Sequence, residues 1–383
     1  MTAGSLHTEA GKIPANWSRK QVRELGAVVT GGTPSTHISE YWNGDIPWIT
    51  PTDISNQRDL YESERMISDA GLRAIRALPP NTVLVTCIAS IGKNAVLRTV
   101  GASNQQINAV IPNESNNVDF LFYLFESAKT YLAASAGTTA TSIVSKATFQ
   151  NLEFTIPPLP EQRAIAEALS DVDALLSGLD RLIAKKRDLK QAAMQQLLTG
   201  QTRLPGFHGE WEVKRLGDLC SLKSGTSITS ERIDEHSPFP CFGGNGLRGF
   251  TAEHTHEGEY ALIGRQGALC GNVVRAGGKF FASEHALVVT PKPRTLIDWL
   301  AYVLRRSNLN QYSESSAQPG LSAAKLLLLE IRSPPNLDEQ TAIAQVLSDM
   351  DAELAALEAR REKTRQLKQG MMQELLTGRT RLV

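Results

Sequence analysis

The chain has 383 residues, of which 41% are hydrophobic and 21% charged; this composition is typical of a folded protein, and the length predicts more than one domain. Forty basic residues balance forty acidic ones, which argues against a nucleic-acid-binding domain that acts alone, because such domains are usually basic.

No apolar run is long enough to cross a bilayer, and residues 1–12 lack the features of a secretory signal. We therefore expect a cytoplasmic protein with no membrane partner. Its four cysteines have no C-x-x-C spacing, which predicts buried, reduced thiols.

The first part of the chain, roughly residues 14 to 156, mixes short β-like runs with helical ones. Thr82–Thr86 and Ala95–Leu97 are β-branched or apolar and are bounded by Gly, Asn and Pro, which predicts strands. Phe120–Ala133 has the spacing of a short helix. These runs predict a loop-rich mixed domain.

A repeated segment follows. A stretch that begins at Glu161 recurs at Glu339 with a constant shift of 178 positions and about 26 identities in 44 pairs. Both copies follow a proline-bearing lead-in and end in Leu-Leu-Thr-Gly, where Gly200 and Gly378 supply the left-handed conformation that terminates a helix. The repeat therefore predicts two long helices.

Apolar residues in both copies recur with the alternating spacing of four and three that is typical of coiled coils. They are Ile165, Leu169, Val172, Leu176, Leu179 and Ile183 in the first copy, and Ile343, Leu347, Met350, Leu354 and Leu357 in the second. At about 1.5 Å per residue, a helix over residues 161–198 is about 55 Å long, too long to be buried against one small domain. We expect the two helices to pack on each other, so that Asp in place of Leu176 or Leu354 buries an uncompensated charge and costs several kcal/mol.

A second group of apolar residues is expected to extend this seam: Leu189, Ala193 and Leu197, with Leu367, Met371 and Leu375. The first copy carries seven basic and six acidic residues over residues 161–204. Because a DNA-binding arm would be lopsided in charge, we interpret these residues as solvated faces and interhelical pairs.

The second segment, roughly residues 207–333, has the character of the first. Strands are predicted at Tyr260–Ile263, Gly271–Arg275 and Ala286–Thr290, and a helix at Ile297–Tyr312. Weak correspondences link the two segments: Trp17 with Trp211, GGTPS at Gly31 with SGTS at Ser224, and Phe120–Leu124 with Trp299–Val303. The order is therefore domain, helix, domain, helix.

This order, with IPPLPEQRAIAEAL and PPNLDEQTAIAQVL opening helices that both end in LLTG, resembles the specificity subunits of type I restriction-modification systems over essentially the whole chain. The resemblance implies an α+β fold in which two similar mixed α/β target recognition domains are separated by two long helices that form an antiparallel coiled coil, with an approximate twofold symmetry. The implied segments are a first recognition domain over residues 1–157, a first helix over 158–205, a second recognition domain over 206–335 and a second helix over 336–383.

The resemblance also implies a function. Each domain would read one half of a split, asymmetric sequence in double-stranded DNA, and the helices would serve as spacer and docking surface. The implied partners are two modification subunits, which bind S-adenosylmethionine and methylate adenine, and two restriction subunits, which translocate and cleave DNA. The helices are then expected to set the half-site spacing at about one DNA turn, roughly 10 base pairs. An alternative is a coiled-coil scaffold that reads no bases.

An enzyme acting alone on DNA is disfavoured by missing motifs. Residues 242–246 match F-x-G-x-G, a loop pattern of many adenine methyltransferases, but no helix is predicted after them and no [DN]-P-P-[YF] tetrapeptide occurs, so we predict a tight turn. A Walker A loop is also absent. We expect no cofactor and no methyltransferase, nuclease or ATPase activity in the isolated chain.

Histidines are loosely grouped in the second segment, at His236, His254, His256 and His285. They lack a recognisable third ligand, so we predict no metal site.

Base edges are read mainly by Arg or Lys, by Asn or Gln, and by smaller hydroxyl or imidazole groups. Loop residues of these types are the candidate DNA contacts: Thr33, Ser35, Lys93, Asn94, Asn104, Gln105, Gln106 and Lys146 in the first domain, and Ser227, Asn245, Arg248, Arg265, Gln266, Asn272, His285 and Lys325 in the second. Each of them could equally be a turn-forming or solvated residue. Asn104, Gln105 and Gln106 could instead satisfy backbone groups within the protein.

Overall fold

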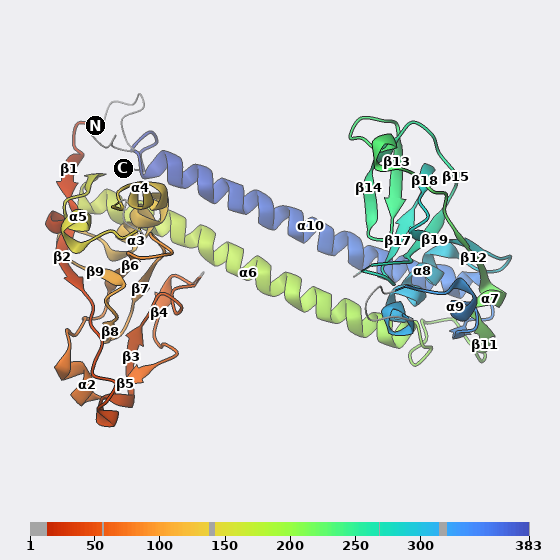
Figure 1. The fold of residues 1–383 in the computed structure, drawn as a ribbon, viewed down its shortest axis with the longest axis horizontal. Helices are drawn as coiled ribbons and strands as arrows, with labels where there is room; N and C mark the ends of the chain where they lie inside the picture. Colours follow the sequence, from red (N-terminus) through yellow and green to blue (C-terminus); the bar gives the residue numbers. More distant parts are fainter. Residues whose placement is uncertain (1–13, 56, 138–141, 268, 314–319, 383) are drawn as a thin grey trace. The chain divides into compact units, whose positions relative to one another are not determined.

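The computed structural model describes residues 14–382 except 56, 138–141, 268 and 314–319. The N-terminal residues considered above for a secretory signal lie outside this range. The chain divides into two compact units: unit 1 consists of Met1–Leu179 and Arg360–Val383, and unit 2 of Asp180–Ala359. Each unit thus contains one of the mixed domains and parts of both long helices (Figure 1).

The domain of unit 1 is built on a five-stranded sheet with the strand order β2-β9-β6-β7-β4, a three-stranded sheet with the order β5-β3-β8, and the pair β1-β10. The strands are β1 Ser18–Gln21, β2 Gly26–Thr30, β3 Trp42–Ile49, β4 Asp59–Leu60, β5 Met66–Ile67, β6 Thr82–Thr86, β7 Asn94–Leu97, β8 Ala102–Ser103, β9 Ile107–Pro112 and β10 Glu153–Ile156. The helices are α1 Val22–Leu25, η1 Ser39–Tyr41, α2 Asp69–Ala74, α3 Val118–Ser127, α4 Lys129–Ala134 and α5 Lys146–Gln150.

Helix α3 supplies much of the core of this domain. Asn117 caps its first turn by accepting a hydrogen bond from the Phe120 amide, and every residue from Phe120 to Phe125 is buried. Its side chains pack with those of β6, β7 and β9 on one face of the larger sheet. Strands β3 and β5 and helix α2 form a separate lobe away from α6 (Figure 1), with its own small core around Trp48 and Ile67.

The domain of unit 2 repeats this plan. Its sheets have the orders β12-β19-β16-β17 and β14-β13-β18-β15, with the pair β11-β20. The strands are β11 Glu212–Arg215, β12 Cys220–Ser224, β13 Phe239–Gly243, β14 Gly246–Thr251, β15 His256–Glu257, β16 Tyr260–Gly264, β17 Val273–Ala276, β18 Lys279–Ala282, β19 Ala286–Pro291 and β20 Glu330–Ser333. The helices are α7 Leu216–Leu219, η2 Ser230–Arg232, α8 Ile297–Arg306, η3 Leu309–Tyr312 and α9 Ala323–Leu326.

The strands expected from sequence are present, with ends shifted by a residue or two. The two expected domain helices are each divided. Phe120–Ala133 becomes α3 and α4 because Ala128 leaves the helical conformation, and Ile297–Tyr312 becomes α8 and η3 because Asn308 is left-handed. Asparagine is one of the few residues that adopts this conformation at low cost.

The two repeats form the long helices α6, Leu159–Leu197, and α10, Leu337–Leu375. They run antiparallel: Lys368 pairs with Asp173 in unit 1, and Lys186 with Glu353 in unit 2, at 2.6 Å in both cases. The two long helices pack together, as the seam predicted.

The extension of the seam through Leu189 and Leu367 is wrong. Their side chains are 48% and 59% exposed. The alternating spacing continues from Ile183 to Lys186 and Lys190 instead. At this turn the seam is occupied by lysine stems, whose ammonium groups pair with carboxylates of α10, namely Glu353 and Asp351. A search for apolar residues alone misses such positions.

An aspartate in each repeat joins three elements. In unit 1, Asp173 accepts a hydrogen bond from Tyr123 of α3 at 2.7 Å and pairs with Lys368 of α10. In unit 2, Asp351 likewise accepts from Tyr302 of α8 at 2.7 Å and pairs with Lys190 of α6. Burial opposes the ionisation of Asp351, but the bonds from Lys190 and Tyr302 outweigh it and hold its pKa below the ordinary value.

A glutamate near the start of each long helix is almost completely buried. Glu339 is 0% exposed and accepts hydrogen bonds from Arg203, at 2.5 and 2.7 Å, and from Trp211 at 3.3 Å. Glu161, 1% exposed, is held in the same way by Arg381 and by Trp17 at 2.9 Å. Each arginine follows the LLTG end of the opposite repeat. The end of one helix is thereby fixed to the start of the other.

The neighbouring glutamine fixes the domain to its helix. Gln162 accepts a hydrogen bond from the Asn117 amide at the start of α3, and Gln340 accepts one from the Leu296 amide at the start of α8. These contacts satisfy amides that a helix start leaves without an intrahelical partner.

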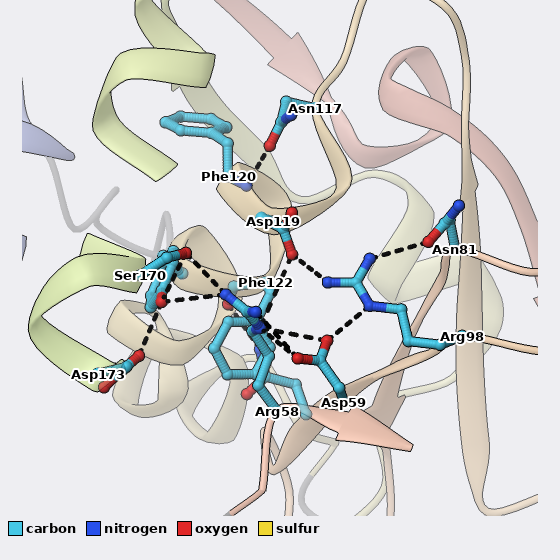
Figure 2. A network of polar contacts seen from close by, with 12 residues as sticks. Arg58, Asp59, Asn81, Arg98, Asn117, Asp119, Phe120, Phe122, Ser170 and Asp173 are labelled. Atoms are coloured by element: carbon cyan, nitrogen blue, oxygen red, sulfur yellow. Dashed lines mark hydrogen bonds and ion pairs between the residues drawn. The ribbon is translucent and has the colours of Figure 1, made fainter. Parts of the chain in front are cut away.

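A polar network gives the first domain an additional attachment to α6 (Figure 2). Asp59 of β4 accepts hydrogen bonds from Arg58 and Arg98, Arg98 also contacts Asp119 of α3, and Arg58 donates to Ser170 of α6 at 2.7 Å. Burial opposes the ionisation of Asp59, yet the two arginines hold its pKa below the ordinary value. Strand β4, at the edge of the sheet, is thus linked to α3 and α6.

The seam can be tested with a pair of substitutions in one helix. Ile183 is 2% exposed and Leu189 is 48% exposed. We expect Ile183→Asp to cost about 3–5 kcal/mol of stability, because it buries an unpaired charge, and Leu189→Asp to change it by less than about 0.5 kcal/mol. Chemical denaturation measures both. Equal losses would contradict the assigned register.

The buried carboxylate in unit 2 can be tested through its arginine. Arg203→Ala leaves the Glu339 carboxylate without its cation, so we expect a loss of about 3–5 kcal/mol in denaturant unfolding. The double variant Arg203→Ala, Glu339→Gln should recover part of it, since the amide carries no charge. Lys214→Ala, which removes a surface ion pair with Glu212, serves as the control and should have little effect. A double variant no more stable than Arg203→Ala would refute the proposed cause.

Candidate nucleic-acid interface

In the first domain, two loops that carry candidate residues meet beside β8. The backbone of Gly31 comes so close to Ser103 and Asn104 that a Cβ atom there would lie 2.2 Å from each of their carbonyl oxygens. Only glycine fits at such a contact. The loop that follows, with Thr33 and Ser35 exposed, therefore lies against residues 103–106.

The side chains of these loops contact one another. Thr33 donates to Gln105 at 2.7 Å, and both residues are exposed. Asn104 is 8% exposed, donates to the Gln106 side chain at 3.0 Å and accepts from the Gln106 amide at 3.0 Å. Asn104 thus organises the loop from within, whereas Thr33 and Gln105 face solvent.

Two lysines join this surface through the backbone of Cys87. The Cys87 amide donates to the Gln106 carbonyl, and the Val144 amide donates to the Cys87 carbonyl at 2.9 Å. Lys93 lies at the end of the turn that follows Cys87, and Lys146 begins α5 just after Val144. Both lysines are exposed.

Asn94 is placed differently. It is 4% exposed, and its side-chain amide donates to the Phe122 carbonyl at 2.7 Å inside the domain. Because the side chain is buried, Asn94 is left out of the surface proposed below.

The second domain brings its candidates together by the same backbone pattern. The Arg265 amide donates to the His285 carbonyl and the Leu321 amide donates to the Arg265 carbonyl, which matches the links made by Cys87. The His285 imidazole lies 3.1 Å from the Gln266 side chain, and Arg265 donates to Ser224 at 2.8 Å. Ser227 is exposed on the adjoining loop.

The remaining candidates lie around this cluster. Arg248 of β14 is exposed, and its side chain passes over Gly243, where a Cβ atom would be 2.4 Å from it. Asn245 and Asn272 line a surface depression of about 630 Å³. Lys325 is exposed in α9.

Residues 242–246 form a hairpin. Gly243 of β13 pairs with Gly246 of β14 across a two-residue turn, and Gly246 has a positive φ of 93°. A strand, not a helix, follows the glycines, as predicted for a tight turn.

Two histidines of this domain, His254 and His256, pack on aromatic rings. His254 lies against Phe239 with ring centroids 4.8 Å apart, and His256 stacks on Phe280 at 5.3 Å. Burial lowers the pKa of His256. Among the described residues, no three His, Cys, Asp or Glu side chains are grouped as metal ligands.

All four cysteines are buried free thiols. Burial raises the pKa of Cys87 to about 11 and that of Cys220 to about 12, so both are protonated near neutral pH. Over the described part of the chain, no helix is sufficiently long and apolar to span a membrane.

Sequence reasoning missed one exposed arginine near the first-domain loops. The guanidinium carbon of Arg65 lies 3.9 Å from the ring centroid of Trp42 and 5.0 Å from that of Trp48. The six-residue spacing of the two tryptophans was the only local signal, and it does not reveal which cation the rings meet.

Comparison with known proteins identifies the family. The family model described as the type I restriction modification DNA specificity domain matches residues 14–185 and 208–368. The specificity subunit of the EcoprrI type I restriction enzyme of Escherichia coli is 35% identical over 340 residues, which cover 84% of each chain.

Solved structures agree on the fold. The S subunit of a type I restriction-modification system from M. genitalium aligns with a TM-score of 0.66 and 18% identity over 96% of this chain and 97% of that chain. A chain from a structural study of complex assembly and conformational transition in the type I R-M system aligns with a TM-score of 0.62 and 18% identity over 96% and 99%.

The family match includes both mixed domains and large parts of both long helices. Specificity subunits are the non-catalytic components of type I restriction enzymes. This chain belongs to the family of type I restriction-modification specificity subunits.

Proposed function

We propose that this chain reads a bipartite, asymmetric sequence in double-stranded DNA, one half-site with each domain, within a complex that also contains two modification and two restriction subunits. The proposal assigns reading to the domains over residues 1–157 and 206–335, and spacing and docking to the helical segments 158–205 and 336–383. We expect the chain to bind this DNA in the cytoplasm.

The proposal rests on a comparison of the two domains: their loops have the same backbone arrangement but carry different side chains. In both domains a glycine, Gly31 or Gly225, packs against the backbone near a buried serine, Ser103 or Ser283. The same backbone links then connect this loop to two further segments. The surface residues differ: exposed Thr33, Ser35, Lys93, Gln105 and Lys146 with half-buried Gln106 in the first domain, and exposed Ser227, Asn245, Arg248, Gln266, Asn272 and Lys325 with half-buried Arg265 and His285 in the second.

Different side chains on the two sets of loops are expected if the two domains bind different half-sites. In the major groove, glutamine can form two hydrogen bonds with adenine, and arginine can form two with guanine. A scaffold that reads no bases does not require two polar loop clusters that share a backbone geometry but differ in their side chains. The zero net charge of the chain fits a division of labour in which partner subunits neutralise many of the phosphates.

Substitution in one domain should relax one half-site only. We expect Arg265→Ala in the assembled modification complex to reduce discrimination at one base pair by about 1–3 kcal/mol, roughly 5–150-fold, while the other half-site is read as before. Gln105→Ala should do the same in the opposite half-site, so each variant is the control for the other. Selection of bound DNA from a random pool measures both. A wild-type complex without sequence preference would favour the scaffold.

The proposed role of the helices can be tested by shortening both. Residues 183–189 of α6 and 352–358 of α10 face each other, as the Lys186–Glu353 and Arg187–Glu358 pairs show. Removing both heptads keeps the remaining pairs in register and shortens each helix by about 10 Å. We expect the spacer between the half-sites to shrink by about three base pairs, at about 3.4 Å each, with the bases unchanged. An active variant that methylates the original spacing would overturn this role.

A further inference from the structure

We propose that Arg65 is a specificity-determining residue of the first domain, which reads a guanine in the major groove. This inference rests on the proposed function and names a residue outside the loops already considered. It is carried by the way in which the lobe of β3, β5 and α2 holds the guanidinium.

The guanidinium of Arg65 is held by two aromatic rings. It lies 3.9 Å from the Trp42 centroid and 5.0 Å from the Trp48 centroid. The two indoles meet edge to face, with an interplanar angle of 90° and centroids 5.2 Å apart. Trp48 is 4% exposed and therefore fixed in the small core of the lobe, whereas Arg65 itself is exposed.

The same tryptophans fasten the loop that carries Thr33 and Ser35. The Trp48 indole N–H donates to the Gly32 carbonyl at 2.9 Å, and the Trp42 indole N–H donates to the Ser35 carbonyl at 3.2 Å. Arg65 and this loop therefore share one rigid support, and the arginine stands beside the proposed reading surface.

The Arg65 guanidinium stacks on aromatic rings and is not neutralised by a carboxylate in the part of the chain that the structure describes. In the described ranges, no carboxylate lies within ion-pairing distance of it, in contrast to Arg58 and Arg98 of the same domain, which are enclosed by Asp59 and Asp119. A guanidinium that stacks on a ring uses its flat face, so its N–H donors, which lie in its own plane, can still bind a bidentate acceptor. Guanine offers such an acceptor through O6 and N7.

Three variants of the full chain, each assembled with the modification subunits, test the inference on a random DNA pool. Arg65→Lys keeps the charge but loses the planar fork. Arg65→Ala removes both. Arg73→Ala removes an exposed arginine of α2 in the same lobe and is the matched control for net charge.

We expect Arg65→Lys and Arg65→Ala each to reduce the preference for guanine at one position of one half-site by about 10–100-fold, and Arg73→Ala to leave it unchanged. Uniform weakening on all sequences by Arg65→Ala, with preference retained in Arg65→Lys, would mean a phosphate contact and would overturn the inference. So would unchanged selection by Arg65→Ala, or an equal loss in Arg73→Ala. If the wild-type complex selects no sequence, the proposed function itself fails, which separates the two failures.

Discussion

A buried carboxylate at the start of each long helix is the constraint on which the structure depends. Removing a charge from water is tolerated only where hydrogen bonds and an opposite charge replace the lost hydration. Glu161 and Glu339 obtain both from an arginine beyond the end of the opposite long helix and from a tryptophan at the start of a domain. Within each unit, one carboxylate therefore fixes a helix start, a helix end and a domain together, and the adjacent glutamine aligns α3 in the first domain or α8 in the second.

The distribution of charge follows from this arrangement. Many cations serve the framework: Lys190 and Lys368 fill the seam, and Arg58 and Arg98 enclose carboxylates at the edge of a sheet. What remains on the loops proposed to read DNA is a mixture of amides, hydroxyls and a few exposed cations. A surface of this kind is suited to donor and acceptor patterns on base edges more than to bulk attraction of phosphates.

Periodicity and repetition in the sequence predicted the long helices, their pairing and the loop-rich domains, because these features depend on neighbours along the chain. The prediction for Leu189 was wrong because it required an apolar residue at the seam. The alternating spacing of four and three instead falls on Lys186 and Lys190. Residue type likewise suggested Asn94 as a base contact, although the fold buries it against Phe122. The stacking of Arg65 on two tryptophans was invisible, since it joins segments that only tertiary packing brings together.

The charged residues of the seam also favour the antiparallel over the parallel orientation of the two long helices. The repeats carry the same charges at two pairs of seam positions, with Asp173 matching Asp351 and Lys190 matching Lys368 at a shift of 178. Side by side in a parallel register, aspartate would meet aspartate and lysine would meet lysine. Reversal of one helix turns both repulsions into attractions, as observed. The matching charges of the two copies thus determine the direction of pairing: a duplicated helix with this charge pattern disfavours the parallel arrangement and favours the antiparallel one.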